Sequence, residues 1–113
     1  MDELQRWASA KFSDVRKSAK RRNIPFELSK DEFMALAMSS ENQCALTGLR
    51  FCFDASETSK YRPWAPSVDR IDHRQGYTLD NCRIVCVIVN NALNQFTVDD
   101  LQHMSRALLL HNS

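Results

Sequence analysis

The chain has 113 residues, of which 43% are hydrophobic and only 2 are glycine, and its formal net charge is +1. This length suits one domain with a single modest core, and the composition excludes a disordered chain. No apolar run approaches the roughly 18 residues that span a bilayer. The start, MDELQRWASAKF, also lacks the apolar segment of a secretory signal. We therefore expect a single helix-rich domain over residues 1–113, located in the cytoplasm and without a membrane partner.

Apolar residues recur at helical spacing near the N-terminus and predict an amphipathic helix over residues 3–22. Its last turns form a basic segment, RKSAKRR, without an acidic residue. The cations of this segment are Arg16, Lys17, Lys20, Arg21 and Arg22. They suit a solvated helix face and the negative end of the helix dipole. They equally suit contact with nucleic-acid phosphates, which a low overall charge does not exclude.

A second helix is predicted in LSKDEFMALAMSS, where Ser29 is the N-cap and Glu32 completes a capping box. Residues 1–40 then form an N-terminal helical part. ENQCALTGLRFCF predicts a turn into a short pair of strands around Thr47 and Gly48. The polar, proline-bearing segment that follows, residues 54–66, predicts a surface loop.

The segment PSVDRI predicts a strand, and DHRQGYTLDN a loop with turns at Gly76 and at Asp80–Asn81. CRIVCVIV, residues 82–89, predicts a second, buried strand, and NNALNQF a short helix. A last helix is predicted over residues 97–111, with Thr97 as its N-cap. The predicted fold class is α+β, with residues 44–96 as its core module.

The 4 cysteines, Cys44, Cys52, Cys82 and Cys86, allow two disulfides, a zinc site or free thiols. Disulfides are disfavoured in a chain without an export signal. Zinc usually takes C-x-x-C pairs, but CALT and CVIV each hold a single thiol. We therefore expect mostly buried free thiols and no structural zinc.

The strand–loop–strand–helix segment can bring Asp69 close to Asn90, near the start of the predicted short helix. A carboxylate and an amide oxygen suit a hard ion such as Mg²⁺, whose remaining ligands are water and phosphate. Such a site suits the cleavage of a phosphodiester. The alternative is structural: Asp69 pairs with Arg62, Arg70 or Arg83, and Asn90 caps the helix.

The stretch from Asp69 to Asn90 resembles the ββα-metal module of HNH nucleases. Asp69 takes the first metal-ligand position, Asn81 of DNCRIVC takes the middle position, and Asn90 takes the last, 90 − 81 = 9 residues further on. The resemblance implies one Mg²⁺ or Mn²⁺ ion held by Asp69 and Asn90. It also implies that Asn81 pins the hairpin loop through backbone hydrogen bonds and so orients the catalytic base.

The resemblance extends beyond the module, over roughly residues 16–108. AKRRNIPFEL, CALTGLRF, RPWAPSVDRID and NNALNQF are similar in order to small HNH-like proteins of phages and prophages. This similarity implies a phage or prophage protein that acts inside a bacterial host cell. CALTG and IVCVIVN resemble a zinc-carrying HNH frame that has lost half of its thiolates.

The chain departs from the family at the general-base histidine, which is replaced by Arg70. A guanidinium stays protonated and cannot accept a proton from water, but it can clamp a phosphate. The base would then be His73 or Asp72 in the loop, with His73 slightly favoured. His103 and His111 have no motif context, and we expect them to be structural or solvent-facing.

These observations predict a metal-dependent HNH-type endonuclease or nickase acting on double-stranded DNA. The basic segment and Arg74 would contact the DNA backbone. The alternative is a degenerate HNH-derived module that binds nucleic acid or a protein partner without cleavage, and a third possibility is a purely structural or regulatory protein. A chain this small also suggests a homodimer or a protein partner.

Overall fold

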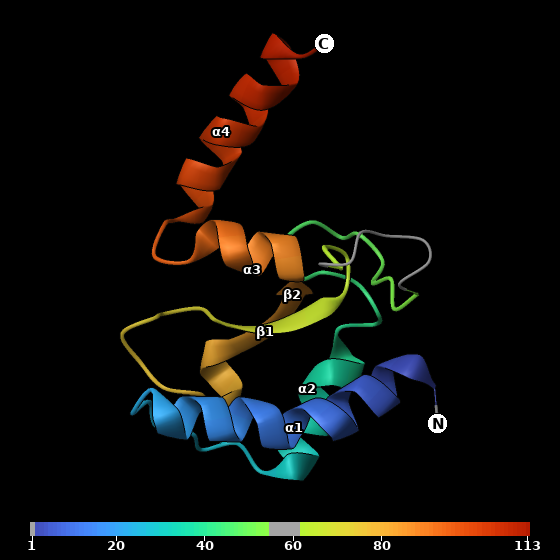
Figure 1. Cartoon of the computed structure of the whole chain (residues 1–113), viewed down its shortest axis with the longest axis vertical. Coiled ribbons are helices and arrows are strands. Elements are labelled where there is room, and N and C mark those ends of the chain that lie inside the picture. The colour runs from blue at the N-terminus through green and yellow to red at the C-terminus, as the bar shows by residue number, and fades with distance from the viewer. Residues whose placement is uncertain (1, 55–61) are drawn as a thin grey trace.

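The computed structural model describes residues 2–54 and 62–113. Its elements are α1 (Glu3–Arg21), α2 (Lys30–Ser39), β1 (Pro66–Arg70), the 3-10 turn η2 (Leu79–Asn81), β2 (Cys82–Cys86), α3 (Val87–Leu93) and α4 (Val98–His111). Figure 1 shows the β1–β2 pair between α3 on one side and α1 with α2 on the other, while α4 extends away from the body. The predicted helix-rich α+β class is confirmed.

The predicted helices are present with the caps that their sequences indicate. Ser29 caps α2 in a capping box with Glu32, and Thr97 caps α4 in a second box with Asp100. α1 begins at Glu3 and ends at Arg21, one residue before the predicted end. None of the described helices is long and apolar enough to cross a membrane.

The boundary between the second strand and the short helix was predicted wrongly. The β-branched run predicts a strand to residue 89, but β2 ends at Cys86 and α3 begins at Val87. β1 begins at Pro66, opposite Cys86, so among the described residues the strand pairing ends at that pair. The N–H groups of Val87 and Ile88 instead donate to the carbonyl oxygens of Ala65 and Pro63, at 2.9 and 3.1 Å. Since these loop carbonyls satisfy the first N–H groups, a helix can start there.

The pair of strands predicted around Thr47 and Gly48 is also wrong. Within the described residues this segment forms only one isolated antiparallel bridge, between Gln43 and Arg50. The N–H of Gly48 donates to the carbonyl of Cys44 at 2.9 Å, so the backbone groups are used inside a tight turn. Most of the surface loop predicted over residues 54–66 lies outside the described residues.

Two clusters of buried side chains flank the strand pair, and β2 contributes to both. Ile84, Val85 and Cys86 lie in one cluster, and Cys82 lies in the other beside Phe33. α1 also spans both clusters, which ties the N-terminal helices to the hairpin. The hairpin is therefore held from one side by α3, which follows β2 directly, and from the other by α1 and α2, which are distant in sequence.

The cysteines are free thiols, and all except Cys52 are buried. The prediction of mostly buried thiols is confirmed. Burial raises the pKa of Cys82 to about 11 and that of Cys86 to about 12, so both are protonated and unreactive near neutral pH.

The hairpin loop is joined to the segment after α1 at Gly76 and Tyr77. The N–H of Tyr77 donates to the carbonyl of Pro25 at 2.9 Å, and the N–H of Glu27 donates to the carbonyl of Tyr77 at 2.8 Å. A Cβ added at Gly76 would lie 2.5 Å from the Pro25 carbonyl oxygen, closer than atoms can approach. Only glycine allows this close contact between the two segments.

We expect Gly76→Ala to lower the free energy of unfolding by about 2–3 kcal/mol, because the backbone at Pro25 must move. Urea denaturation followed by circular dichroism measures this loss. Gly48→Ala is the matched control, since nothing lies within 4 Å of an added Cβ there and only the φ of +74° opposes alanine. Its expected cost is about 1 kcal/mol. An equal or smaller cost for Gly76→Ala would contradict the close contact.

Candidate functional site

A polar cavity of about 360 Å³ opens beside the hairpin. It is lined by Arg22, the residue directly after α1, and by residues of β1, the hairpin loop and α3, among them Asp69, Arg70, His73, Tyr77 and Asn90. Both residues predicted as metal ligands therefore face one cavity, together with one of the two predicted bases.

Asp69 lies on β1 and is only 2% exposed. Its Oδ2 accepts a hydrogen bond from Nε of Arg83 at 2.8 Å, and its Oδ1 lies 3.2 Å from Nε2 of His73. Arg83 is the residue directly opposite Asp69 in the antiparallel register. Of the three arginines considered as structural partners, the structure selects Arg83. A buried carboxylate needs such compensation, because burying it alone is costly.

Asn90 lies in the middle of α3, not at its start as predicted, and does not cap the helix. Its Nδ2 donates to Oγ of Ser67 at 2.7 Å and to the carbonyl oxygen of Val68 at 3.2 Å. These bonds hold α3 against β1 next to Asp69. They use only the amide nitrogen, and within the described part of the chain Oδ1 accepts no hydrogen bond.

Asn81 connects the two ends of the hairpin loop through three hydrogen bonds. Its Oδ1 accepts from the N–H of Asp72 at 2.9 Å, and its Nδ2 donates to the carbonyls of Asp72 and Gly76 at 3.0 and 2.9 Å. This is the backbone pinning that the HNH resemblance implies. Its catalytic consequence stays a prediction.

Arg70 braces the same loop from the inside. Its Nη1 donates to the carbonyl oxygens of His73 at 3.0 Å and Gln75 at 2.7 Å, and its guanidinium carbon lies 5.3 Å from the centre of the Tyr77 ring. Arg70 therefore helps to place His73. A guanidinium has five N–H donors, so Arg70, which also lines the cavity, has donors beyond these two bonds.

The two candidate bases have different surroundings. The side chain of His73 is 35% exposed, lines the cavity and contacts Asp69. Asp72 instead accepts hydrogen bonds from the backbone and guanidinium of Arg74 at 2.9 and 3.1 Å, and it lines a different hollow. The side-chain hydrogen bond from Arg74 lowers the pKa of Asp72, which makes it a weaker base.

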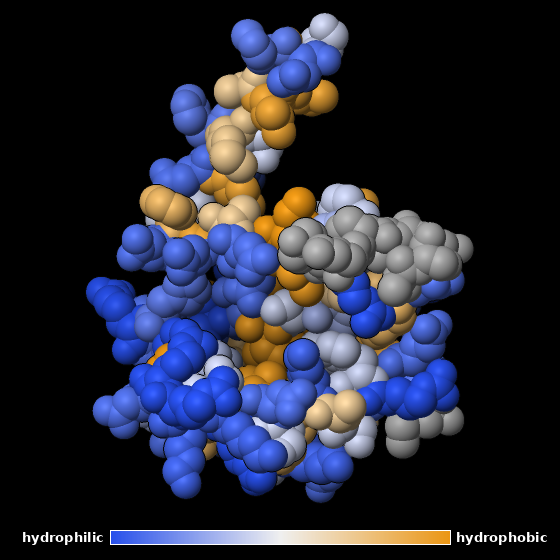
Figure 2. All heavy atoms as spheres, viewed as in Figure 1, coloured by the Kyte–Doolittle hydropathy of each residue, from blue (hydrophilic) through white to orange (hydrophobic). Residues whose placement is uncertain are grey.

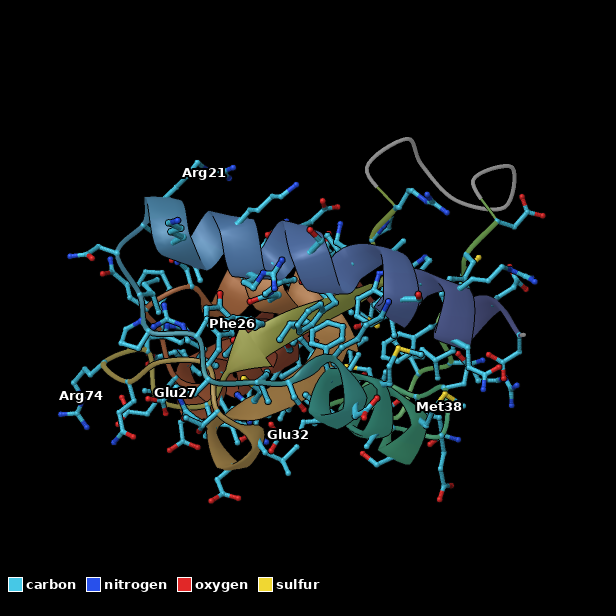
Figure 3. All side chains as sticks on the ribbon, turned by 90° about the horizontal axis from the view of Figure 1, so that it is seen from below. Arg21, Phe26, Glu27, Glu32, Met38 and Arg74 are labelled. Atoms are coloured by element: carbon cyan, nitrogen blue, oxygen red, sulfur yellow. The ribbon has the colours of Figure 1, made fainter. Side chains whose placement is uncertain are left out.

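The basic end of α1 borders the cavity. Arg22 lines it, and Nη1 of Arg22 lies 3.5 Å from the hydroxyl of Tyr77. Arg21 lines an adjacent hollow that also includes Tyr77, and Arg16 with Lys20 lines another at the end of the helix. In Figure 3, Arg21 projects outward from the end of α1.

The remaining predicted residues lie outside the cavity. Lys17 is exposed and lines neither it nor the adjacent hollows. Arg74 is 90% exposed, pairs with Asp72 and points outward in Figure 3. His103 and His111 are solvent-facing on α4, as expected.

One residue of the site, Tyr77, was missed in the sequence. Arg83 was named only as one of three possible partners of Asp69, and the hairpin register places it directly opposite Asp69. Tyr77 gives no such signal, since a tyrosine after a turn glycine is ordinary. Its place in the cavity depends on the contact of the loop with α1 and Pro25.

The donor atoms at the cavity fit a hard divalent ion. The carboxylate of Asp69 and the amide oxygen of Asn90 are the oxygen ligands that Mg²⁺ and Mn²⁺ prefer. Among the described residues, no three or more His, Cys, Asp and Glu side chains form a cluster able to hold a metal ion. A metal here would need water or substrate oxygens to complete its coordination.

We expect Arg83→Met to lower the free energy of unfolding by about 3 kcal/mol, because it leaves the Asp69 carboxylate buried without its charge partner. Adding Asp69→Asn in the same chain should recover part of this loss. Urea denaturation of the wild type, of Arg83→Met and of the double variant measures both effects. Lys30→Met, at an exposed position, is the control, and its free energy of unfolding should stay within about 0.5 kcal/mol of the wild-type value. A cost for Arg83→Met below about 1 kcal/mol would show that the ion pair is unimportant for stability.

The structure can be compared with known proteins. No protein-family model matches the chain. An uncharacterized protein of Acanthamoeba polyphaga mimivirus is 29% identical over 92 residues, which are 81% of this chain but only 15% of that protein, so the chain spans a small part of this relative. The structure of PacI, a rare-cutting HNH restriction endonuclease, is similar with a TM-score of 0.65 and 23% identity, and the match covers 88% of this chain and 74% of that chain. The chain therefore has an HNH-like fold.

Proposed function

We propose that the protein is a metal-dependent endonuclease or nickase that hydrolyses phosphodiester bonds of double-stranded DNA. The observation that carries this proposal is the convergence of Asp69, His73 and Asn90 on one polar cavity, at the end of the basic segment of α1. An acidic ligand, an amide ligand and a base at one polar cavity suit metal-assisted hydrolysis. The HNH-like fold shared with PacI, which is a restriction endonuclease, supports the same chemistry.

Asp69 and Asn90 are the residues that would hold one Mg²⁺ or Mn²⁺ ion. When bound, this ion supplies positive charge to the phosphoryl oxygens and to the leaving oxygen. Each oxygen of Asp69 already has one partner, but a carboxylate oxygen has a second lone pair available. The hydrogen bonds of Nδ2 fix the orientation of the Asn90 amide and keep its oxygen available.

His73 is the better of the two candidate bases. When its Nε2–H donates to Asp69, its Nδ1 carries a lone pair that can accept a proton from water. Asn81 and Arg70 hold the loop that carries His73, through the backbone at residues 72–76. Asp72 is occupied by Arg74 and lies away from the cavity, so its role would be to support the loop.

The cations near the cavity would bind the DNA backbone. Arg22 and Arg70 line the cavity itself and would contact the phosphates next to the scissile bond. Arg16, Lys20 and Arg21 extend the positive surface along α1 and would place the duplex without reading its sequence. Lys17 and Arg74 would add weaker contacts from exposed positions.

A second candidate function is binding without cleavage. Two observations favour it. Both oxygens of the Asp69 carboxylate already contact protein groups, His73 and Arg83. Arg70 also stands where the resemblance to HNH nucleases places the general base. In that case the charge of Arg83 would take the place of a metal ion. Such a module would keep the basic end of α1 for nucleic acid, or would bind a protein partner.

Other expectations stay predictions. These are the cytoplasmic location, a homodimer or protein partner, and a phage or prophage origin in a bacterial host. Neither PacI nor the mimivirus protein supports a phage origin.

The first test of the proposed reaction is plasmid nicking by the purified protein with Mg²⁺ or Mn²⁺. We expect Asp69→Ala and Asn90→Ala to lower the rate by roughly a hundredfold or more, because each removes one of two protein ligands. Asp80→Ala is the matched control, since Asp80 is exposed, lies in the same hairpin and does not line the cavity. Circular dichroism of each variant separates a lost ligand from a lost fold.

Cleavage that persists in Asp69→Ala and Asn90→Ala would contradict the metal site. Absence of cleavage by the wild-type protein, with DNA binding that weakens as salt rises, would support the binding module instead.

A second test separates the two bases. We expect His73→Ala to lower the nicking rate by about 10²–10⁴-fold, because general-base catalysis is lost. Asp72→Asn should lower it much less, because Asp72 acts only on the loop. Single-turnover rates at saturating metal measure both changes. Equal rates for His73→Ala and the wild type would exclude His73 as the base.

A further inference from the structure

Tyr77 lies between the polar cavity and a neighbouring hollow. It follows Gly76 in the hairpin loop, and it lines both the cavity and the hollow that Arg21 also lines. Figure 2 shows hydrophilic side chains gathered in this region, where the end of α1 lies near the hairpin loop. Tyr77 itself is only 6% exposed. The hydroxyl of a buried tyrosine usually has a polar partner, so the contacts of Tyr77 indicate its role.

The position of Tyr77 is fixed by its backbone and by its ring. Its N–H donates to the carbonyl of Pro25 at 2.9 Å, and its carbonyl accepts from the N–H of Glu27 at 2.8 Å. Its ring centre lies 5.6 Å from that of Phe26, and Figure 3 labels Phe26 and Glu27 on this segment after α1. Contacts on both backbone groups and on the ring leave the side chain little freedom. The hydroxyl is therefore held at a defined place beside the cavity.

Two arginines of the cavity contact Tyr77 in different ways. Nη1 of Arg22 donates to the hydroxyl oxygen of Tyr77 at 3.5 Å, and the guanidinium carbon of Arg70 lies 5.3 Å from the ring centre. The first contact is a long hydrogen bond, and the second places a cation over the negative face of an aromatic ring. Tyr77 thus connects a cation at the end of α1 with a cation at the end of β1.

Neither of these guanidinium groups is neutralised by a carboxylate. Within the described part of the chain, Arg22 and Arg70 make no ion pair. Asp69, the carboxylate that lines the cavity, is paired with Arg83. Two cations without a carboxylate partner beside one cavity suit an anion, and the oxygens of a phosphate can accept hydrogen bonds from both guanidinium groups.

We propose that Tyr77 is a positioning residue, which holds Arg22 and Arg70 toward one phosphate of the DNA backbone. Its hydroxyl oxygen orients Arg22 and its ring face orients Arg70, so both guanidinium groups are pre-organised before the substrate binds. Pre-organisation raises affinity, because less side-chain freedom is lost on binding. This inference rests on the DNA substrate of the proposed function, but it does not require cleavage.

The alternative is a purely structural role for Tyr77. Its ring belongs to the core cluster that also contains Leu28 and Phe33. If packing were the whole role, the ring would be sufficient and phenylalanine would serve equally well. The hydroxyl, which accepts the hydrogen bond from Arg22, therefore distinguishes positioning from packing.

A double-mutant cycle between Tyr77 and Arg22 tests the proposal. Fluorescence anisotropy measures the affinity for a short DNA duplex without divalent metal, so that binding is separated from cleavage. We expect Tyr77→Phe to weaken binding about threefold to tenfold, because it removes the oxygen that orients Arg22. Arg22→Ala should weaken binding roughly tenfold and lower the salt dependence by about one phosphate contact. Adding Tyr77→Phe to Arg22→Ala should have no further effect.

Three further variants separate positioning from folding, and circular dichroism checks the fold of each. In an Arg21→Ala background, where the neighbouring cation is lost instead, Tyr77→Phe should weaken binding as much as it does in the wild type. Leu28→Val, in the same core cluster as Tyr77, should lower stability without changing the affinity for DNA. Tyr77→Leu also removes the ring, so it should weaken binding even in the Arg22→Ala background, through Arg70.

Two results would overturn the positioning role alone. They are a wild-type affinity for Tyr77→Phe, and losses that add up when Tyr77→Phe and Arg22→Ala are combined. Coupling of the two residues in a protein that does not nick plasmid would support the positioning role and contradict only the proposed cleavage. A wild-type protein that binds no DNA would overturn both.

Discussion

The candidate site depends on one buried charge, the carboxylate of Asp69 on the first strand of the hairpin. With 2% exposure this group is stable only because Arg83 from the paired strand and His73 from the loop both contact it. The Arg83 contact requires the β1–β2 register, and the His73 contact requires the loop conformation that Asn81 and Arg70 hold. Strand register and loop geometry are thus constrained by the same carboxylate.

The role of Arg70 changes with this view of the site. In the sequence, Arg70 stands where the resemblance to HNH nucleases places a general-base histidine. In the structure its guanidinium donates hydrogen bonds to the carbonyl oxygens of His73 and Gln75 and lies over the ring of Tyr77. The backbone of Tyr77 is in turn hydrogen-bonded to the segment after α1. Arg70 is therefore a brace of the loop. On the proposed function, the base is His73, three residues further along the loop, and Arg70 holds it there.

The parts of the site that were predicted from sequence are local ones. Asp69, Asn81 and Asn90 follow one another along a single hairpin and helix, so their spacing is readable in the chain. The start of α3 was not readable, because a β-branched run favours a strand and the carbonyls of Pro63 and Ala65 come from a loop. The approach of Arg22 and Tyr77 to the cavity was likewise hidden, since it depends on a contact between segments about fifty residues apart.

The two ends of the chain use their amphipathic helices in opposite ways. α1 buries its apolar residues in both core clusters and leaves cations at its end, beside the cavity. α4 has a similar apolar pattern but contributes only its first turns to the body, through Val98 and Leu101. The rest of α4 packs against no core cluster of the described residues, and Leu108, Leu109 and Leu110 are exposed along it. Equal apolar content thus stabilises the fold at one end of the chain and contributes little to it at the other.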